Sequence, residues 1–158
     1  MSRLSPRSNF RFSPVPRNMA AASAHATGTA YSLTNSSALL ALGTTTPSIT
    51  LNGPGNYLLL GRAVLDYNGA TFAASRSVTL KLRRTNNTAA DIDNSATVID
   101  TSVVTLLTST LGSVVLPPVL YSTDNSNDTI QIHGDVAVVP TAGSLDVVEA
   151  SIIAVKLS

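Results

Sequence analysis

Two segments near the C-terminus exchange apolar and polar side chains at almost every step, residues 128–133 and 145–153. A period of two belongs to β-strands, in which successive side chains face opposite sides of a sheet. The same pattern recurs back to about residue 30, between clusters of Gly, Pro, Asn, Asp, Ser and Thr that favour turns. Only Ala20–Ala26 has a composition that favours a helix, and the chain is therefore predicted to be all-β.

The composition favours a single packed domain. Of 158 residues, 44% are hydrophobic but only 4% are aromatic, so the core must consist mainly of Val, Ile, Leu and Ala, which suit a β-sandwich. The absence of Cys excludes disulfides, thiolate chemistry and cysteine zinc sites. A small domain without covalent cross-links gains its stability from packing or from oligomerisation, and we expect oligomerisation here.

The cationic side chains are unevenly distributed along the chain. Residues 1–17 hold four Arg and no acidic residue, whereas the remainder holds six cationic and nine acidic side chains, a formal charge of −3. This balance argues against a general nucleic-acid surface on the body of the protein. Any contact with a polyanion would have to come from the N-terminal segment.

We expect residues 1–28 to form an extended arm and residues 29–158 to form the folded domain. Three prolines in the first 16 residues oppose both helix formation and sheet pairing, and few apolar groups offset the entropy cost of ordering. Phe10-Arg11-Phe12 places two rings on one side of an extended segment and is a candidate anchor on a partner; a plain flexible terminus is the alternative. The candidate partner-binding residues of the arm are Arg3, Arg7, Phe10, Arg11, Phe12 and Arg17.

The arm does not have the pattern of a membrane or secretion signal. No apolar run of secretory length follows the positive start, and no segment is apolar enough to span a membrane, so we predict no membrane association. An organelle transit peptide is a further alternative, which the prolines oppose because they prevent an amphipathic helix.

The turn signals divide the body into about eight to ten short strands, the number that a two-sheet jelly roll needs. Two hairpins are expected, residues 57–67 with 71–84 across Asn68-Gly69 and residues 128–139 with 145–157. Pro117-Pro118 cannot donate ladder hydrogen bonds and should interrupt residues 111–121 with a bend or a sheet edge. The other expected strands are residues 30–34, 38–42, 48–51, 97–99 and 102–108.

The last expected strand is apolar on both faces. One face holds Leu145, Val147, Ile153, Val155 and Leu157, and the other holds Val148, Ala150, Ile152 and Ala154. A sandwich strand normally has one solvated face. Since no helix is expected to cover it, we predict that further copies of the chain bury the second face.

Several segments of the body share a more specific pattern: residues 49–51, 55–59, 78–86, 127–132 and 150–155, with Gly55-x-Tyr57 as the sharpest element. Together they resemble the C1q/TNF-like jelly roll, in the version found in structural proteins of tailed bacteriophages. The resemblance covers about residues 30–157 and implies a compact homotrimer with strands packed about a three-fold axis. The chain departs from extracellular members of that family in its shortage of aromatic residues, and the arm has no counterpart in the shared pattern.

We therefore expect a virion structural protein, a capsid decoration or cement protein that is assembled in the host cytoplasm and whose arm binds the major capsid protein. The reasons are a body without an active site, an expected oligomer interface and a short cationic arm. The expected oligomer interface consists of Tyr57, Leu59, Val148, Ile152, Ile153 and Val155. A fibre or spike head that binds a host receptor or glycan is an alternative, although no stalk of heptads or Gly-X-Y triplets is present. A small shell-forming coat protein is another alternative, but four Arg in the arm are few for packaging nucleic acid.

The sequence contains few residues that suit catalysis or metal binding, and we predict no enzyme activity, no cofactor and no metal site. His25 falls in the arm, and His133 is expected on a solvated strand face beside Asp135. The acidic loops 91–94 and 124–128 offer oxygen ligands that suit Ca²⁺, but an EF-hand counted from Asp91 lacks its turn Gly and its bidentate Glu. Polar turns are the preferred interpretation of both loops.

Overall fold

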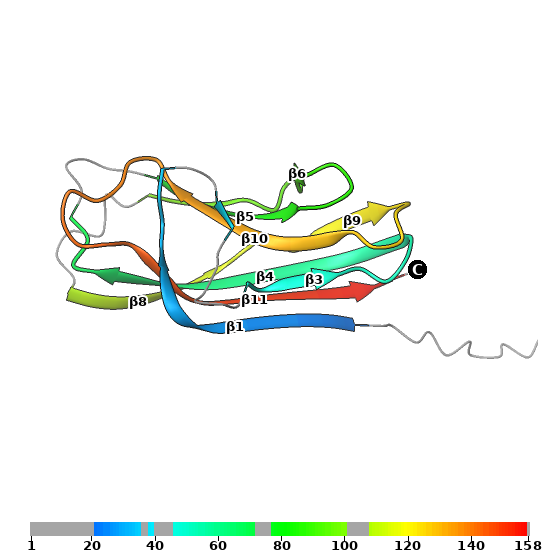
Figure 1. Cartoon of the computed structure of the whole chain (residues 1–158), viewed down its shortest axis with the longest axis horizontal. Helices are drawn as coiled ribbons and strands as arrows, with labels where there is room; N and C mark the ends of the chain where they lie inside the picture. The colour runs from blue at the N-terminus through cyan, green and yellow to red at the C-terminus, as the bar shows by residue number, and fades with distance from the viewer. Residues whose placement is uncertain (1–20, 36–37, 40–45, 72–76, 101–107, 158) are drawn as a thin grey trace, which may run out of the picture.

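The structure, a computed structural model, describes residues 21–35, 38–39, 46–71, 77–100 and 108–157. These residues form two antiparallel β-sheets that pack face to face as a sandwich, and none of them lies in a helix (Figure 1). The all-β prediction is confirmed. Among the described residues there is no helical segment with the length and hydropathy needed to cross a membrane.

The strands divide between two sheets, which we call sheet A and sheet B. Sheet A contains β1 (Ala21–Ser32), β11 (Asp146–Lys156) and β4 (Gly55–Asn68) in that order, with β8 (Thr108–Val115) and β9 (Val119–Thr123) on the far edge of β4. Sheet B has β10 (Thr129–Val136) and β5 (Ser77–Arg84) at its centre. Its remaining strands are β2 (Ala38–Leu39), β3 (Ser48–Thr50), β6 (Ala90–Asp91) and β7 (Thr97–Asp100).

The far edge of β4 is shared by two strands that lie end to end. β9 pairs with residues 55–59 of β4, and β8 pairs with residues 62–68. Pro117 and Pro118 lie exposed between the two strands. The predicted interruption of residues 111–121 is therefore confirmed, because neither proline donates a ladder hydrogen bond.

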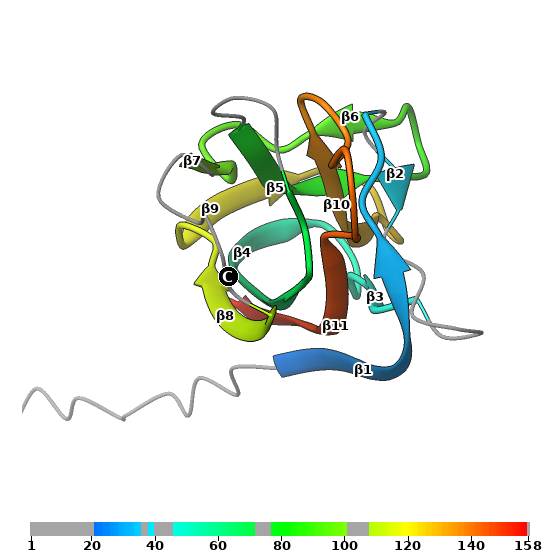
Figure 2. The same cartoon turned by 90° about the vertical axis from the view of Figure 1, so that its left-hand side faces the viewer.

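Both predicted hairpins are wrong, because the chain changes sheet at each of these turns. β4 lies in sheet A and β5 in sheet B, while β10 lies in sheet B and β11 in sheet A. Partners distant in sequence replace the expected ones: β4 pairs with β11, and β5 pairs with β10. This alternation between layers gives the jelly-roll connectivity, and Figure 2 shows β1, β11 and β8 below β5 and β10.

The facing sides of the two sheets form one hydrophobic core. β5 and β10 alternate between half-buried and fully buried residues, as the period of two predicts. Tyr57 is buried at the start of β4, and its hydroxyl donates a hydrogen bond to the carbonyl oxygen of Gly53 at 2.7 Å, which closes the turn before this strand. The largest fully buried side chains are Leu51, Leu59, Leu65, Leu80, Leu82, Leu116, Ile130, Ile132, Leu145 and Ile152.

A β-bulge in β11 changes the faces predicted for this strand. The register with β4 shifts between Val147 and Glu149, which leaves Val148 as the extra residue. An extra residue reverses the side to which all following side chains point. The core-facing residues of β11 are consequently Val147, Ala150, Ile152 and Ala154, and Leu145 just before the strand is also buried. The prediction that Ile153 and Val155 share a face with Leu145 is wrong.

β1 extends the folded part further towards the N-terminus than predicted. It starts at Ala21, where it pairs with Val155, and runs along β11 to Ser32. The expected boundary after residue 28 is therefore too late, and His25, expected in the arm, lies exposed on β1 opposite Ser151. Residues 1–20, and the predicted strand positions 40–42 and 102–107, lie outside the described residues.

Candidate assembly surface

The outer face of sheet A carries apolar side chains at the end where β9 lies. Ile153 on β11 is 40% exposed and Leu120 on β9 is 74% exposed, while their neighbours on β4 and β11 are half-buried. The Cα pairings Ile153↔Leu60, Val155↔Leu58 and Leu58↔Leu120 place these side chains next to one another on three adjacent strands. We call Leu58, Leu60, Leu120, Ile153 and Val155 the apolar band.

An ion pair bounds the apolar band on the side towards β8. The guanidinium of Arg62 lies 2.6 Å from the carboxylate of Glu149, and its Nε donates a hydrogen bond to the hydroxyl of Ser113 at 2.9 Å. Exposed pairs of this kind contribute at most about 1 kcal/mol to stability. The pair therefore sets a polar border on the outer face rather than holding the sheet together.

Only part of the predicted interface lies on this surface. Tyr57, Leu59 and Ile152 are 3%, 0% and 0% exposed and pack inside a single chain, so these three residues cannot contact a second copy in this fold. Val148 is half-buried at the bulge. Ile153 and Val155 belong to the apolar band and stay candidates for the interface.

Three residues of the apolar band are absent from the predicted interface. For Leu58 and Leu60 the sequence holds a signal, because both faces of β4 start apolar and the outer face becomes polar at Arg62. Leu120 has no comparable signal. Its exposure follows from the position of β9 at the edge of sheet A, which depends on pairing with residues 55–59.

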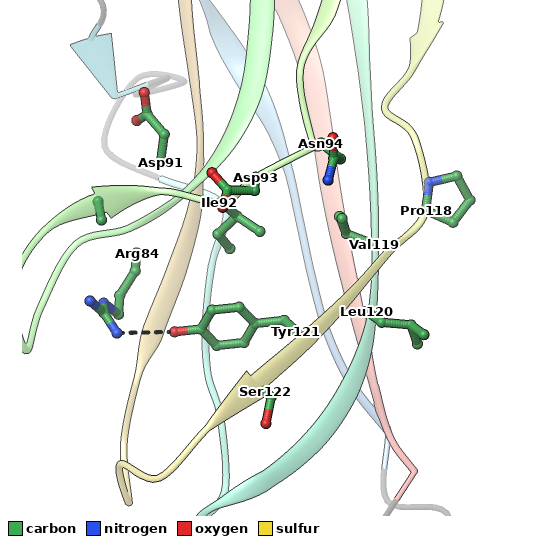
Figure 3. A pocket seen from close by; sticks show the side chains of 11 residues that line it. Arg84, Asp91, Ile92, Asp93, Asn94, Pro118, Val119, Leu120, Tyr121 and Ser122 are labelled. Carbon is green, nitrogen blue, oxygen red and sulfur yellow. Dashed lines mark hydrogen bonds between the residues drawn. The ribbon is translucent and has the colours of Figure 1, made fainter.

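A cleft of about 530 Å³ lies between β9 and residues 90–94 (Figure 3). Ile92 and Val119 form part of its apolar lining from opposite sides, and Asp91 and Asp93 lie on the same side as Ile92, across the cleft from β9. The ring of Tyr121 extends from β9 towards Arg84, whose guanidinium donates a hydrogen bond to the tyrosine hydroxyl at 3.3 Å. The cleft thus lies between two segments that are distant in sequence, a polar loop and the strand that follows Pro117-Pro118.

Asp128 accepts hydrogen bonds from four side chains beside this cleft. The hydroxyls of Tyr121 and Thr123 donate to one carboxylate oxygen, both at 2.6 Å, and the amides of Asn87 and Asn125 donate to the other, both at 3.0 Å. Burial alone would raise the pKa of Asp128, but the hydrogen bonds outweigh burial and lower this pKa to about 2. The ionised carboxylate thus joins two loops, in agreement with the polar-turn interpretation of residues 124–128.

The other acidic loop is held by ion pairs. Asp91 lies 2.8 Å from the ammonium of Lys81 and 2.5 Å from the guanidinium of Arg83. Hydrogen bonding, mainly from Lys81, lowers the pKa of Asp91. Within the described ranges, no three His, Asp, Glu or Cys side chains gather in a way that could hold a metal ion.

His133 lies in a drier environment than predicted. Its Nε2 atom is buried and has no hydrogen-bond partner among the residues described. Burial, and next the positive charge of Arg83, lower the pKa of His133, so its imidazole is neutral near pH 7. The predicted solvated pair with Asp135 is therefore wrong. The arm candidates Arg3, Arg7, Phe10, Arg11, Phe12 and Arg17 all lie outside the described residues.

The fold resembles solved structures, although no protein-family model and no curated protein sequence matches the chain. Eiger TNF from S. frugiperda aligns with a TM-score of 0.51 and 16% identity, over 86% of this chain and 92% of that chain. A chain of the T13 IBDV viral particle aligns with a TM-score of 0.46 and 11% identity, over 87% of this chain and 35% of that chain. Likeness at this level of identity concerns the fold alone. The protein is a TNF-like jelly-roll sandwich, as the sequence predicts.

Proposed function

We propose that this protein is a virion structural protein, a homotrimeric decoration protein of a bacteriophage capsid, and that it assembles through the apolar band. The observation that carries the proposal is the cluster of outward-facing large apolar side chains on three adjacent strands of sheet A, of which Ile153 and Leu120 are exposed and Leu58, Leu60 and Val155 are half-buried. Contiguous exposed apolar surface of this kind marks interaction sites, because burying it yields about 25 cal/mol per Å².

A ring of three copies needs two different contact surfaces on each copy, since every contact in it is head-to-tail. The apolar band supplies one surface. The second is offered by the flank of the sandwich, the edge where β7 of sheet B meets β8 of sheet A. Val98, beside Thr79 on the outer face of sheet B, and Val115, beside Arg62 on the outer face of sheet A, are 63% and 66% exposed there. The hydroxyl of Thr97 donates a hydrogen bond to the carbonyl oxygen of Val115 at 3.2 Å, so these two strands lie next to each other on that flank. The trimer itself is proposed from the resemblance of the sequence to the C1q/TNF-like jelly roll.

The arm is proposed to bind the major capsid protein through its Arg residues. Arg3, Arg7 and Arg17 would attract an acidic shell surface, while Phe10-Arg11-Phe12 stays the candidate anchor on a partner. The arm leaves the body at Ala21, which pairs with Val155 of the apolar band. It therefore begins at the edge of the assembly surface. The proposed location, the capsid surface after assembly in the host cytoplasm, follows from the same sequence resemblance.

The mass of the purified chain in light scattering tests the assembly. We expect about three times the chain mass of 16.3 kDa, and a monomer for Ile153→Lys, which places a charge in the apolar band. Val138→Lys is the matched control, because Val138 is 44% exposed and Ile153 is 40% exposed, but Val138 lies in the loop after β10. A monomeric unmodified protein would refute the proposal.

Co-sedimentation with isolated capsids tests the arm. A deletion of residues 1–20 leaves β1 whole, and should keep the trimer but abolish capsid binding. A deletion that continues to residue 28 would remove most of β1 and would confuse loss of binding with loss of folding. Capsid decoration by the protein that lacks residues 1–20 would show that the body, not the arm, makes the contact.

A further inference from the structure

The cleft beside β9 has two strand edges that are available for pairing. β9 pairs only with β4, and β6 pairs only with β5, among the described residues. Alternate N–H and C=O groups along the free edge of an antiparallel strand point outward and form hydrogen bonds with an added strand. Residues 119–122 of β9 present such an edge directly to the cleft. The geometry therefore suits an extended polypeptide segment.

The lining of the cleft indicates which side chains such a segment should carry. Asp91 is neutralised by Lys81 and Arg83, and Arg84 lies 3.7 Å from the carboxylate of Asp128. Asp93 is exposed and makes no ion pair with any described residue. The cleft thus combines one uncompensated negative charge with apolar walls from Ile92, Pro118 and Val119. A segment with large apolar side chains and a neighbouring cation complements it.

We propose that residues 7–13 of a neighbouring copy's arm occupy this cleft as a strand added to β9. These seven residues, Arg7–Ser13, are free of proline between Pro6 and Pro14, so each of them can donate a ladder hydrogen bond. In an extended segment Phe10 and Phe12 project to one side, towards the apolar walls, and Arg11 projects to the opposite side, where its long side chain would pair with the exposed carboxylate of Asp93. This inference rests on the proposed function, because the neighbouring copy must be present to supply its arm.

The position of β1 favours a neighbouring copy over the arm of the same chain. Ala21, Val155, Leu58 and Leu120 follow one another across sheet A, so Ala21 lies about 14 Å from Leu120, three strand spacings. An arm that reached its own cleft would lie across Val155 and Leu58 and would cover the apolar band. The eight Cα–Cα steps from Ser13 to Ala21 span up to about 27 Å, which is enough to reach the cleft of a copy packed on that band.

Photo-cross-linking in the full chain tests the inference. The variant Phe12→p-benzoylphenylalanine is mixed with a differently tagged unmodified chain and irradiated. We expect a cross-link between the two chains, and its site on the unmodified chain should map to residues 118–122 or 90–94. Asp93→Lys should reduce the cross-linking yield about tenfold, the effect of about 1.4 kcal/mol. Asp135→Lys, which makes the same charge change on sheet B outside the cleft, should leave the yield unchanged.

The possible failures of this experiment are distinguishable. Links confined within one chain, or links to other segments, would overturn the inference, as would rapid hydrogen exchange at residues 118–122 in a trimer that gives no link. In each of these cases the mass in light scattering still reports a trimer, and the proposed function survives. A monomeric mass refutes the proposed function first, and the inference with it.

Discussion

Asp128→Asn tests whether one buried carboxylate holds together the loops at residues 85–88 and 123–128. All four hydrogen-bonding neighbours of Asp128 donate, whereas an Asn side chain offers one acceptor oxygen and one donating amide. Two of the four donors would therefore face an amide that cannot accept. A carboxyl pKa of about 2 in the folded state, against about 3.9 in an unfolded chain, corresponds to about 2 to 3 kcal/mol. We expect the substitution to lower the free energy of unfolding by this amount at pH 7.

The pH dependence of this difference has a definite sign. The folded state favours the ionised form of Asp128, so its stabilisation is complete above the unfolded pKa of about 3.9 and is lost as the pH falls towards the folded pKa of about 2. The stability difference between the unmodified protein and Asp128→Asn should therefore shrink between about pH 5 and about pH 2. An effect of side-chain packing alone would not change over this range.

Urea unfolding followed by tyrosine fluorescence measures the difference, since the chain contains no Trp. The protein concentration must be held constant, because the stability of an oligomer depends on it. Asp124→Asn is the matched control: it makes the same change at an exposed position in the same turn, and should alter stability by at most about 0.5 kcal/mol. Equal urea midpoints for Asp128→Asn and Asp124→Asn would show that other contacts hold these loops.

Three further substitutions report on the turn, the core and the outer face of sheet B. Thermal unfolding should show that Gly143→Ala destabilises the protein more than Gly69→Ala. Both glycines have a positive φ (67 and 64), but a Cβ at Gly143 would collide with the backbone of Gly69, whereas a Cβ at Gly69 meets nothing within 4 Å. Ile152→Ala should cost about 2 to 5 kcal/mol in urea unfolding, whereas Val138→Ala at an exposed position should cost at most about 0.5 kcal/mol. Burial lowers the pKa of His133, so the unfolded state binds a proton at this residue first as the pH falls, and the protein becomes less stable. The urea midpoint should therefore drop between about pH 7 and about pH 5, and it should drop less in His133→Gln than in the unmodified protein.

Features that depend on a few neighbouring residues could be predicted from the sequence. The alternation in β5 and β10 correctly assigns their buried faces, and Pro117-Pro118 correctly separates β8 from β9. The start of β1 could not be placed, because Ala, Ser and Thr give almost no contrast between the two faces of a strand. What identifies residues 21–28 as a strand is their pairing with β11, more than a hundred positions away in the chain.

Features that depend on pairing between distant segments were missed for the same reason. The turns at Asn68-Gly69 and at residues 140–144 are correctly placed, but a turn signal does not tell whether the next strand returns to the same sheet or crosses to the other one. The bulge at Val148 has no sequence signature, yet it decides that Ile152 faces the core and Ile153 faces solvent. The cleft and the apolar band both result from these non-local arrangements.

The outer face of sheet A changes from apolar to acidic along its strands, and this gradient limits how copies could pack. At one end lies the apolar band, and the Arg62–Glu149 pair borders it. Beyond that pair, Asp66 lies directly opposite Asp146 across β4 and β11, and one carboxylate oxygen of Asp66 is buried without a hydrogen-bond partner among the described residues. Three copies in contact along the whole face would bury the carboxyl group of Asp66 from each copy, at a high electrostatic cost. Contact over the apolar end alone avoids this cost, so the proposed trimer should be closed near Ala21 and open at the acidic end, with all three arms leaving from the closed end.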